Sequence, residues 1–165
     1  MSLQGKVIAV TGGGSGIGLA TAKLISQRGG TVCIADVNSD VLGEVESYFT
    51  SITPSVPYMI SKVDIANRQE VESWIAEIKD KHGRLDGAAN VAGVIGKDHG
   101  MNSVAELDDD EWHKIIAVNL TGLMYCLRGE LNNISDGGSI VNMASIHATT
   151  GQLPLLVMFQ TPLSL

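Results

Sequence analysis

The sequence predicts an α/β protein whose centre is a doubly wound parallel sheet of about five strands. Short apolar runs alternate along the chain with longer stretches of helical periodicity. These runs lack a polar face, which is typical of parallel strands covered by helices on both sides. Apolar residues make up 44% of the 165 residues and aromatic residues only 4%, so we expect aliphatic side chains and Met to fill the core.

A first βαβ unit is expected over residues 6–36. Residues 6–11 (KVIAVT) form an apolar strand, and a glycine-rich turn joins it to a helix over 17–28. Gly29 and Gly30 end that helix before a second strand over 31–36. The unit has roughly the thirty residues that a parallel crossover needs.

The alternation of strands and helices continues to residue 144. Asn67 and Glu70 form an N-cap pair at the start of one helix, and the acidic residues 108–111 favour the N-terminus of another through its dipole. In chain order we expect a helix over 39–49, a strand over 58–63, a helix that includes 71–78, a strand over 87–91, a helix over 112–131 and a strand over 139–144.

Composition argues against several kinds of partner. With 11 basic and 18 acidic residues and no block of like charge, nucleic acid is not expected to bind. The N-terminus lacks a signal-type segment and the longest apolar run, 153–159, is too short to span a bilayer, so we expect a cytoplasmic protein without a membrane partner. Cys33 and Cys126 are expected to be buried thiols, and the four histidines lack ligand spacing, so no metal is expected.

A glycine-rich turn runs from Thr11 to Gly18, between the first strand and the first helix. Glycines there let backbone amides approach a pyrophosphate, and the helix N-terminus supplies the positive end of a dipole. The alternative is a tight turn that serves only close helix packing. The surrounding βαβ unit and an acid at the end of its second strand favour dinucleotide binding.

That acid is Asp36, 18 residues after Gly18. A carboxylate at this place accepts hydrogen bonds from the ribose hydroxyls of NAD and repels the 2′-phosphate of NADP. No Arg or Lys stands beside it. Its alternative role is to enter the loop or cap the next helix, which residues 38–40 could also do. The sequence therefore favours NAD, with NADP as the weaker candidate.

Further motifs follow in order along the chain. They are T-G-x-x-x-G-x-G over 11–18, the acid Asp64 followed by Ile65, N-x-A-G over 90–93, Asn119 within VNLTG, and Ser145 after the last expected strand. Over about residues 3–150 this series resembles the short-chain dehydrogenase/reductase family. The resemblance implies a Rossmann-like sheet of strand order 3-2-1-4-5 without the family's C-terminal strands. It also implies hydride transfer between NAD(P)(H) and a secondary alcohol or ketone.

The resemblance implies a role for each motif residue. Asp64 and Ile65 would border the adenine, Asn119 would hold a water in a proton relay, and Ser145 would hydrogen-bond the substrate. Structural alternatives remain: a cap for Asp64, a link between strands for Asn90, a local disturbance of the helix for Asn119 and an ordinary strand-end hydroxyl for Ser145. The implied cofactor-binding residues are Gly12, Gly14, Ser15, Gly16, Ile17, Gly18, Asp36, Asp64, Ile65, Asn90, Ala92 and Gly93, and the implied catalytic residues are Ser145 and Asn119.

The sequence lacks the family's Y-x-x-x-K pair, in which the tyrosine is the acid/base and the lysine makes its phenol more acidic. Its three tyrosines all precede Ser145, and no lysine follows Lys114. Phe159 and Leu163 stand at the corresponding positions, and neither can transfer a proton. His147 is the remaining group near Ser145 that could act as a base near neutral pH, unless it only lines a loop or the substrate pocket.

We therefore expect a dinucleotide-binding domain over 1–150 and a divergent tail over 151–165, in which Pro162 interrupts a helix. A shifted frame, a retained intron or alternative splicing would each produce such a tail. The first functional hypothesis is a truncated, impaired oxidoreductase for a small-molecule alcohol or ketone of a biosynthetic or tailoring pathway. The second is an inactive dinucleotide-binding or interaction module, which forms a homo-oligomer or associates with an intact relative.

Overall fold

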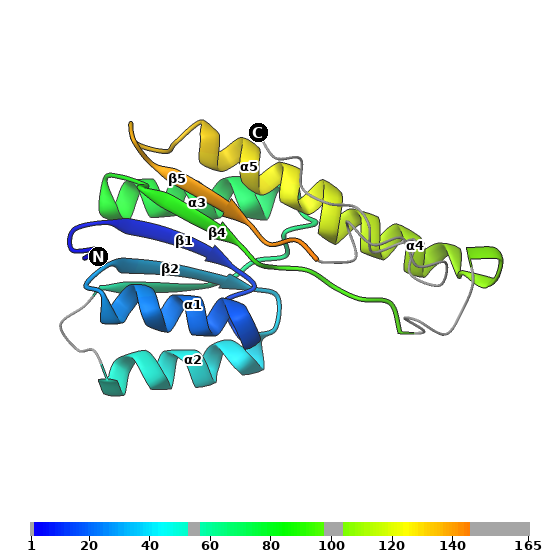
Figure 1. Cartoon of the computed structure of the whole chain (residues 1–165), viewed down its shortest axis with the longest axis horizontal. Coiled ribbons are helices and arrows are strands. Elements are labelled where there is room, and N and C mark those ends of the chain that lie inside the picture. Colours follow the sequence, from blue (N-terminus) through cyan, green and yellow to red (C-terminus); the bar gives the residue numbers. More distant parts are fainter. Residues whose placement is uncertain (1, 53–56, 98–103, 146–165) are drawn as a thin grey trace.

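A computed structural model describes residues 2–52, 57–97 and 104–145. In these residues five strands form one parallel sheet in the order β3-β2-β1-β4-β5, which confirms the predicted fold class and strand order (Figure 1). The tail over 151–165 and His147 lie outside the described residues. The elements are β1 (Val7–Thr11), α1 (Gly16–Gln27), β2 (Thr31–Asp36), α2 (Ser39–Ile52), β3 (Tyr58–Lys62), α3 (Arg68–His82), β4 (Gly87–Asn90), the 3₁₀ turn η1 (Val104–Glu106), α4 (Asp109–Ile116), the π-helical segment η2 (Ala117–Gly122), α5 (Leu123–Leu131) and β5 (Ser139–Asn142).

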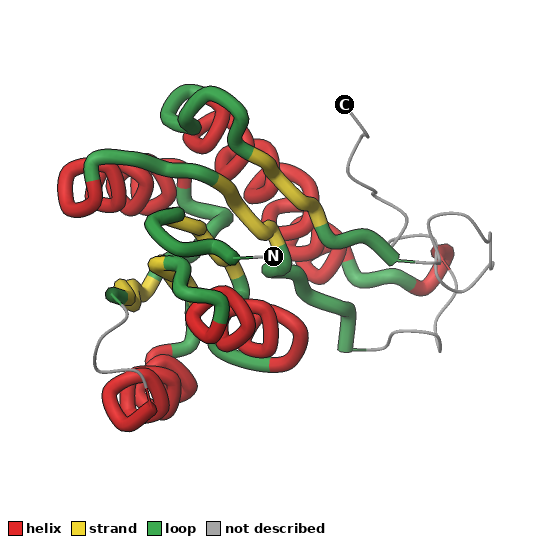
Figure 2. The backbone as a smooth tube through the Cα atoms, turned by 60° about the vertical axis from the view of Figure 1, so that its left-hand side comes forward, coloured by secondary structure: helices red, strands yellow, loops and turns green. Residues whose placement is uncertain are grey.

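Helices cover both faces of the sheet, α1 and α2 on one side and α3 and α5 on the other (Figures 1 and 2). Alternate residues of each central strand enter two separate cores. In β1, for example, Ala9 packs in the core under α3 and α5, whereas Val10 packs in the core under α1 and α2. Burial on both faces explains why the strand sequences show no polar alternation.

The start of α3 shows how local sequence fixes an element. The Asn67 side chain accepts hydrogen bonds from the backbone N–H groups of Gln69 and Glu70, which confirms the predicted cap. The Glu70 carboxylate accepts in turn from the Asn67 side-chain amide at 2.9 Å and from the Asp64 backbone N–H at 2.8 Å. This pairing ties the start of α3 to the segment that follows β3.

The predicted helix over 112–131 is present, but it starts three residues earlier and is not α-helical throughout. The helix begins at Asp109, because the Asp108 side chain accepts from the Glu111 N–H at 3.0 Å. It then widens into η2 before it continues as α5. Tertiary packing accompanies the widening: a Cβ at Gly122 would stand 2.9 Å from the Ile65 side chain and 3.0 Å from its carbonyl oxygen. No helix in the described part of the chain is both long and apolar enough to cross a bilayer.

Candidate functional site

A cavity of about 390 Å³ opens at the carboxyl ends of the strands. It lies beside β1, where the strand order reverses between β2 and β4, and this switch point is where open α/β sheets bind ligands. Ten predicted site residues line it: Gly12, Ser15, Gly16, Ile17, Gly18, Asp36, Asp64, Ile65, Ala92 and Gly93. Four others, Gly14, Asn90, Asn119 and Ser145, are not among its lining residues.

The turn after β1 requires glycine at several positions. Gly12 and Gly16 have positive φ values of 65° and 50°. A Cβ at Gly18 would stand 2.1 Å from the Gly12 carbonyl oxygen, and one at Gly12 would stand 2.7 Å from the Ala92 backbone. The turn therefore packs backbone against backbone, which leaves the N-terminus of α1 open to the cavity.

Asp36 holds this turn from the end of β2. Its Oδ2 accepts from the Gly14 N–H at 3.0 Å, and its Oδ1 accepts from the Asn38 N–H at 3.0 Å. Gly14 thus acts behind the cavity wall, where a Cβ would stand 2.7 Å from Asp36 Oδ2. The entry to α2 is satisfied separately, because Asn38 Oδ1 accepts from the Asp40 N–H at 3.0 Å. Asp36 is thus a fixed carboxylate at the cavity that also holds the start of the loop through the Asn38 N–H, but it does not cap α2.

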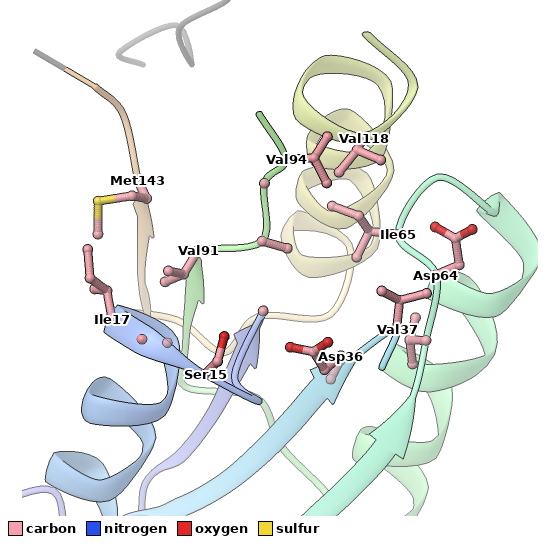
Figure 3. Close-up of a pocket in the computed structure, with 17 residues that line it drawn as sticks. Ser15, Ile17, Asp36, Val37, Asp64, Ile65, Val91, Val94, Val118 and Met143 are labelled. Atoms are coloured by element: carbon pink, nitrogen blue, oxygen red, sulfur yellow. The ribbon is translucent and has the colours of Figure 1, made fainter. Parts of the chain in front are cut away.

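The two ends of the cavity differ in chemistry (Figure 3). Asp36, Asp64 and Val37 lie at one end, whereas Ile17, Val91 and Met143 lie at the other. Asp64 Oδ1 accepts from the Ala66 N–H at 2.9 Å, so its carboxylate closes a local turn while it lines the cavity. No Lys or Arg of the described residues lines the cavity, so its charged groups are two acids.

Asn90 is the last residue of β4, directly before the lining residue Val91, and it is almost fully buried. Its Nδ2 donates to Glu130 Oε2 at 2.9 Å and to Asn142 Oδ1 at 3.1 Å. Its Oδ1 accepts from Thr11 Oγ1 at 3.5 Å. These contacts correspond to the structural alternative for Asn90, a link between neighbouring strands.

Asn119 of η2 holds the loop that follows β4. Its Oδ1 accepts from the Val94 N–H at 2.8 Å, and its Nδ2 donates to the Val94 carbonyl at 2.9 Å. Glu111 of α4 also accepts from the Lys97 N–H in this loop. Ser145 is half-buried and follows β5 by three residues. Asn119 therefore reaches the cavity through Val94, which lines it.

Sequence reasoning missed apolar lining residues and one buried acid. The missed lining residues are Ala35, Val37, Val63, Val91, Val94, Val118 and Met143. Most stand next to a predicted motif residue, so adjacency to the strand ends was an available signal.

Glu130 of α5 had no such signal, because its burial depends on how α5 packs on the sheet. Burial raises the pKa of Glu130 to about 7, and the hydrogen bond from Asn90 offsets only part of this effect.

A doubly wound parallel sheet with a glycine-walled cavity at its switch point defines the Rossmann-like class of α/β proteins. The family model described as short chain dehydrogenase matches residues 6–157. The chain therefore belongs to the short-chain dehydrogenase family.

Named relatives and solved structures agree with this assignment. The chain is 60% identical over 151 residues to the short-chain dehydrogenase/reductase ABA4 of Pyricularia oryzae, a match that covers 92% of this chain and 56% of that protein. It is 40% identical over 154 residues to the chanoclavine-I dehydrogenase ifgE of Penicillium roqueforti, covering 89% and 59%. The crystal structure of levodione reductase superposes with a TM-score of 0.87 at 27% identity, covering 95% of this chain and 60% of that one. The chain thus spans a little over half the length of these relatives.

Proposed function

We propose that this chain forms the cofactor-binding part of an oxidoreductase that transfers hydride between NAD(H) and a secondary alcohol or ketone. The observation that carries the proposal is the Asp36 carboxylate, which the Gly14 N–H fixes at a glycine-walled cavity. Backbone amides and the N-terminus of α1 suit a pyrophosphate there. The apolar end beside Ile17, Val91 and Met143 suits a nicotinamide ring, which needs surroundings free of water.

The charges around the cavity favour NAD over NADP. Each Asp36 oxygen accepts one backbone N–H and keeps a lone pair that can accept from a ribose hydroxyl. A 2′-phosphate would meet the carboxylates of Asp36 and Asp64, and none of the described lining residues is a cation that could offset them. NADP should therefore bind more weakly than NAD.

Titration of NADH and NADPH by calorimetry tests this preference. We expect tighter binding of NADH, and Asp36→Ala should narrow the difference because it removes both the acceptor and the repulsion. Asp40→Ala is the matched control, since Asp40 is an exposed acid nearby that does not line the cavity. Equal or tighter NADPH binding by the unmodified chain would contradict the proposal.

The substrate proposed is an alcohol or ketone of a small metabolite. The proposal rests on the relatives, which include chanoclavine-I dehydrogenases of Penicillium roqueforti and Claviceps purpurea. In this proposal Ser145 hydrogen-bonds the reacting oxygen, and Asn119 positions the loop wall beside it through Val94.

A second candidate function is binding without turnover, because Phe159 and Leu163 stand where the resemblance places the family's Tyr and Lys. General acid–base help is worth roughly 100- to 10,000-fold in rate. We therefore expect no useful NADH oxidation over a panel of carbonyl compounds. A chimaera in which an intact relative supplies the segment after Gly151 should gain activity. Turnover by the unmodified chain at the rate of the chimaera would reject this candidate and make His147→Ala the next variant.

A further inference from the structure

Glu130 is a fully buried acid with few hydrogen-bond partners to offset its loss of solvation. The residue is 0% exposed, and its Oε2 accepts one hydrogen bond, from Asn90 Nδ2 at 2.9 Å. Its Oε1 is buried without a hydrogen-bond partner in the described part of the chain. An apolar side chain of similar size would cost less free energy at this place. Core packing alone therefore does not account for a carboxyl group here.

The partner of Glu130, Asn90, uses both donors of its side-chain amide and one acceptor position of its oxygen. Asn90 directs its two Nδ2 hydrogens to Glu130 and Asn142, and its Oδ1 accepts from Thr11. These contacts orient the amide with its oxygen toward β1 and its nitrogen between α5 and β5. Without the acceptor on Glu130, one hydrogen of the buried amide would lose its partner.

Asn90 and Thr11 connect directly to the cavity walls. Thr11 Oγ1 accepts from the backbone N–H groups of Val91 at 3.2 Å and Ala92 at 3.3 Å. The Asn90 carbonyl accepts from the Met143 N–H at 2.8 Å. Val91, Ala92 and Met143 all line the cavity, and Figure 3 shows Val91 and Met143 at the same end of it.

We propose that Glu130 is a positioning residue whose carboxyl group fixes the Asn90 amide, and that this amide holds the Val91, Ala92 and Met143 walls at the spacing that the dinucleotide needs. The part of the inference that concerns cofactor affinity rests on the proposed function. The part that concerns the Asn90 amide does not.

The surroundings of Glu130 make its contribution depend on pH. Burial raises its pKa to about 7, so the group is largely neutral below neutral pH and ionises above it. The strands β4 and β5 and the segment η2 carry no titratable side chain. On α5 itself the buried Cys126 stays a thiol, because burial and Glu130 raise its pKa to about 12. From α3, Lys79 donates to the Asn133 carbonyl at 3.2 Å. Ionised Glu130 would thus add a buried charge with no donor at Oε1.

The test is NADH affinity of the 165-residue chain measured at pH 6 and pH 8. Ionisation makes Glu130 a stronger acceptor for Asn90, but it leaves a buried charge without a donor at Oε1. If this charge displaces Glu130 from its place, affinity should fall roughly tenfold between these values, because the binding-competent fraction falls by that factor. Glu130→Gln keeps an acceptor for Asn90 and does not ionise, so this dependence should vanish while affinity at pH 6 is kept. Glu130→Leu packs without an acceptor and should bind weakly at both values. Glu46→Gln, an exposed acid on α2, is the control and should behave as the unmodified chain.

A second readout needs no cofactor. The side-chain amide resonances of Asn90 in ¹H–¹⁵N spectra should shift with an inflection near pH 7, and Glu130→Gln should remove this inflection. If no variant binds NADH but the inflection is present, the proposed function fails and the positioning role stands. An NADH affinity with the same pH dependence in Glu130→Gln as in the unmodified chain, or an Asn90 resonance insensitive to both substitutions, would overturn the inference.

Discussion

Gly18 is a position where one added methyl group should disrupt the glycine-rich turn of the site. A Cβ added at this residue would stand 2.1 Å from the Gly12 carbonyl oxygen, so Gly18→Ala must displace the turn. We expect a loss of about 1–3 kcal/mol in the free energy of unfolding and at least tenfold weaker NADH binding. Denaturant unfolding and calorimetry measure both quantities.

Gly43→Ala provides the comparison for this substitution. Gly43 is an exposed residue in the middle of α2, and nothing lies within 4 Å of its Cβ position. Alanine should stabilise the protein there by about 0.5–1 kcal/mol, because it reduces the entropy that the helix loses on folding. Equal effects of the two substitutions would show that the close approach at Gly18 is not limiting.

Asp86, which directly precedes β4 at the amino ends of the strands, makes the free energy of unfolding depend on pH in the acidic range. Burial raises its pKa, but hydrogen bonds from Arg84, the Val7 N–H and Lys6 together outweigh burial and lower the pKa to about 2. A lowered pKa contributes stability above the unfolded value of 3.8, and this contribution is lost as pH falls toward 2. Asp86→Asn should abolish about 2 kcal/mol of the loss in unfolding free energy between pH 5 and pH 2. The exposed Asp136→Asn should leave that loss unchanged.

At the scale of elements, η2 and the loop after β4 act as one unit through Asn119. Asn119→Ala removes both hydrogen bonds to Val94. Since each such bond is worth roughly 1 kcal/mol, protection of the Val94 amide from hydrogen exchange should fall at least tenfold. Exchange followed by mass spectrometry or NMR measures this. Asn132→Ala, an exposed asparagine that ends α5, should leave Val94 protected. Unchanged protection in Asn119→Ala would mean that other contacts hold the loop.

Elements governed by local chemistry were predictable from the sequence. The strands and the Asn67 cap follow from apolar runs and from side-chain acceptors near the backbone, whereas the strand order was implied by the family resemblance. The widening at η2 was not predictable, because it accompanies contacts between Gly122 and Ile65 and between Asn119 and Val94 that join segments far apart in sequence. For the same reason Asn119 was assigned to the site without its partner.

The candidate site followed the same division. Motif residues gather at the cavity because parallel strands present their carboxyl ends at one edge of the sheet. Gly14 and Asn90 were assigned to the cofactor, but they contact Asp36 and Glu130 and do not line the cavity. Glu130 itself was missed, since a single acid in a helix gives no sign of burial before the packing of that helix is known.

At the scale of the whole molecule, β5 forms an apolar edge of the sheet that the structure describes. In the described residues β5 pairs with β4 alone, and Val141 and Met143 are 61% and 44% exposed. Such edges pair with other chains. We expect the 165-residue chain to self-associate with rising concentration, as seen by sedimentation velocity. Val141→Lys should shift it toward monomer, whereas Val37→Lys, which changes an exposed valine away from this edge, should not. A monomer at all concentrations would contradict this expectation.

Because β1 lies between β2 and β4, its two edges become paired at different times while the chain is synthesised on the ribosome. The β2 residue that pairs with Val7, Thr31, is synthesised soon after it. The β4 residue that pairs with Ile8, Gly87, is synthesised 79 positions later. At about 5–20 residues per second this interval lasts roughly 4–16 seconds. Throughout that interval β1, which is the central strand of the folded sheet, is an edge strand. Its unpaired backbone groups can then pair with chaperones or with neighbouring nascent chains.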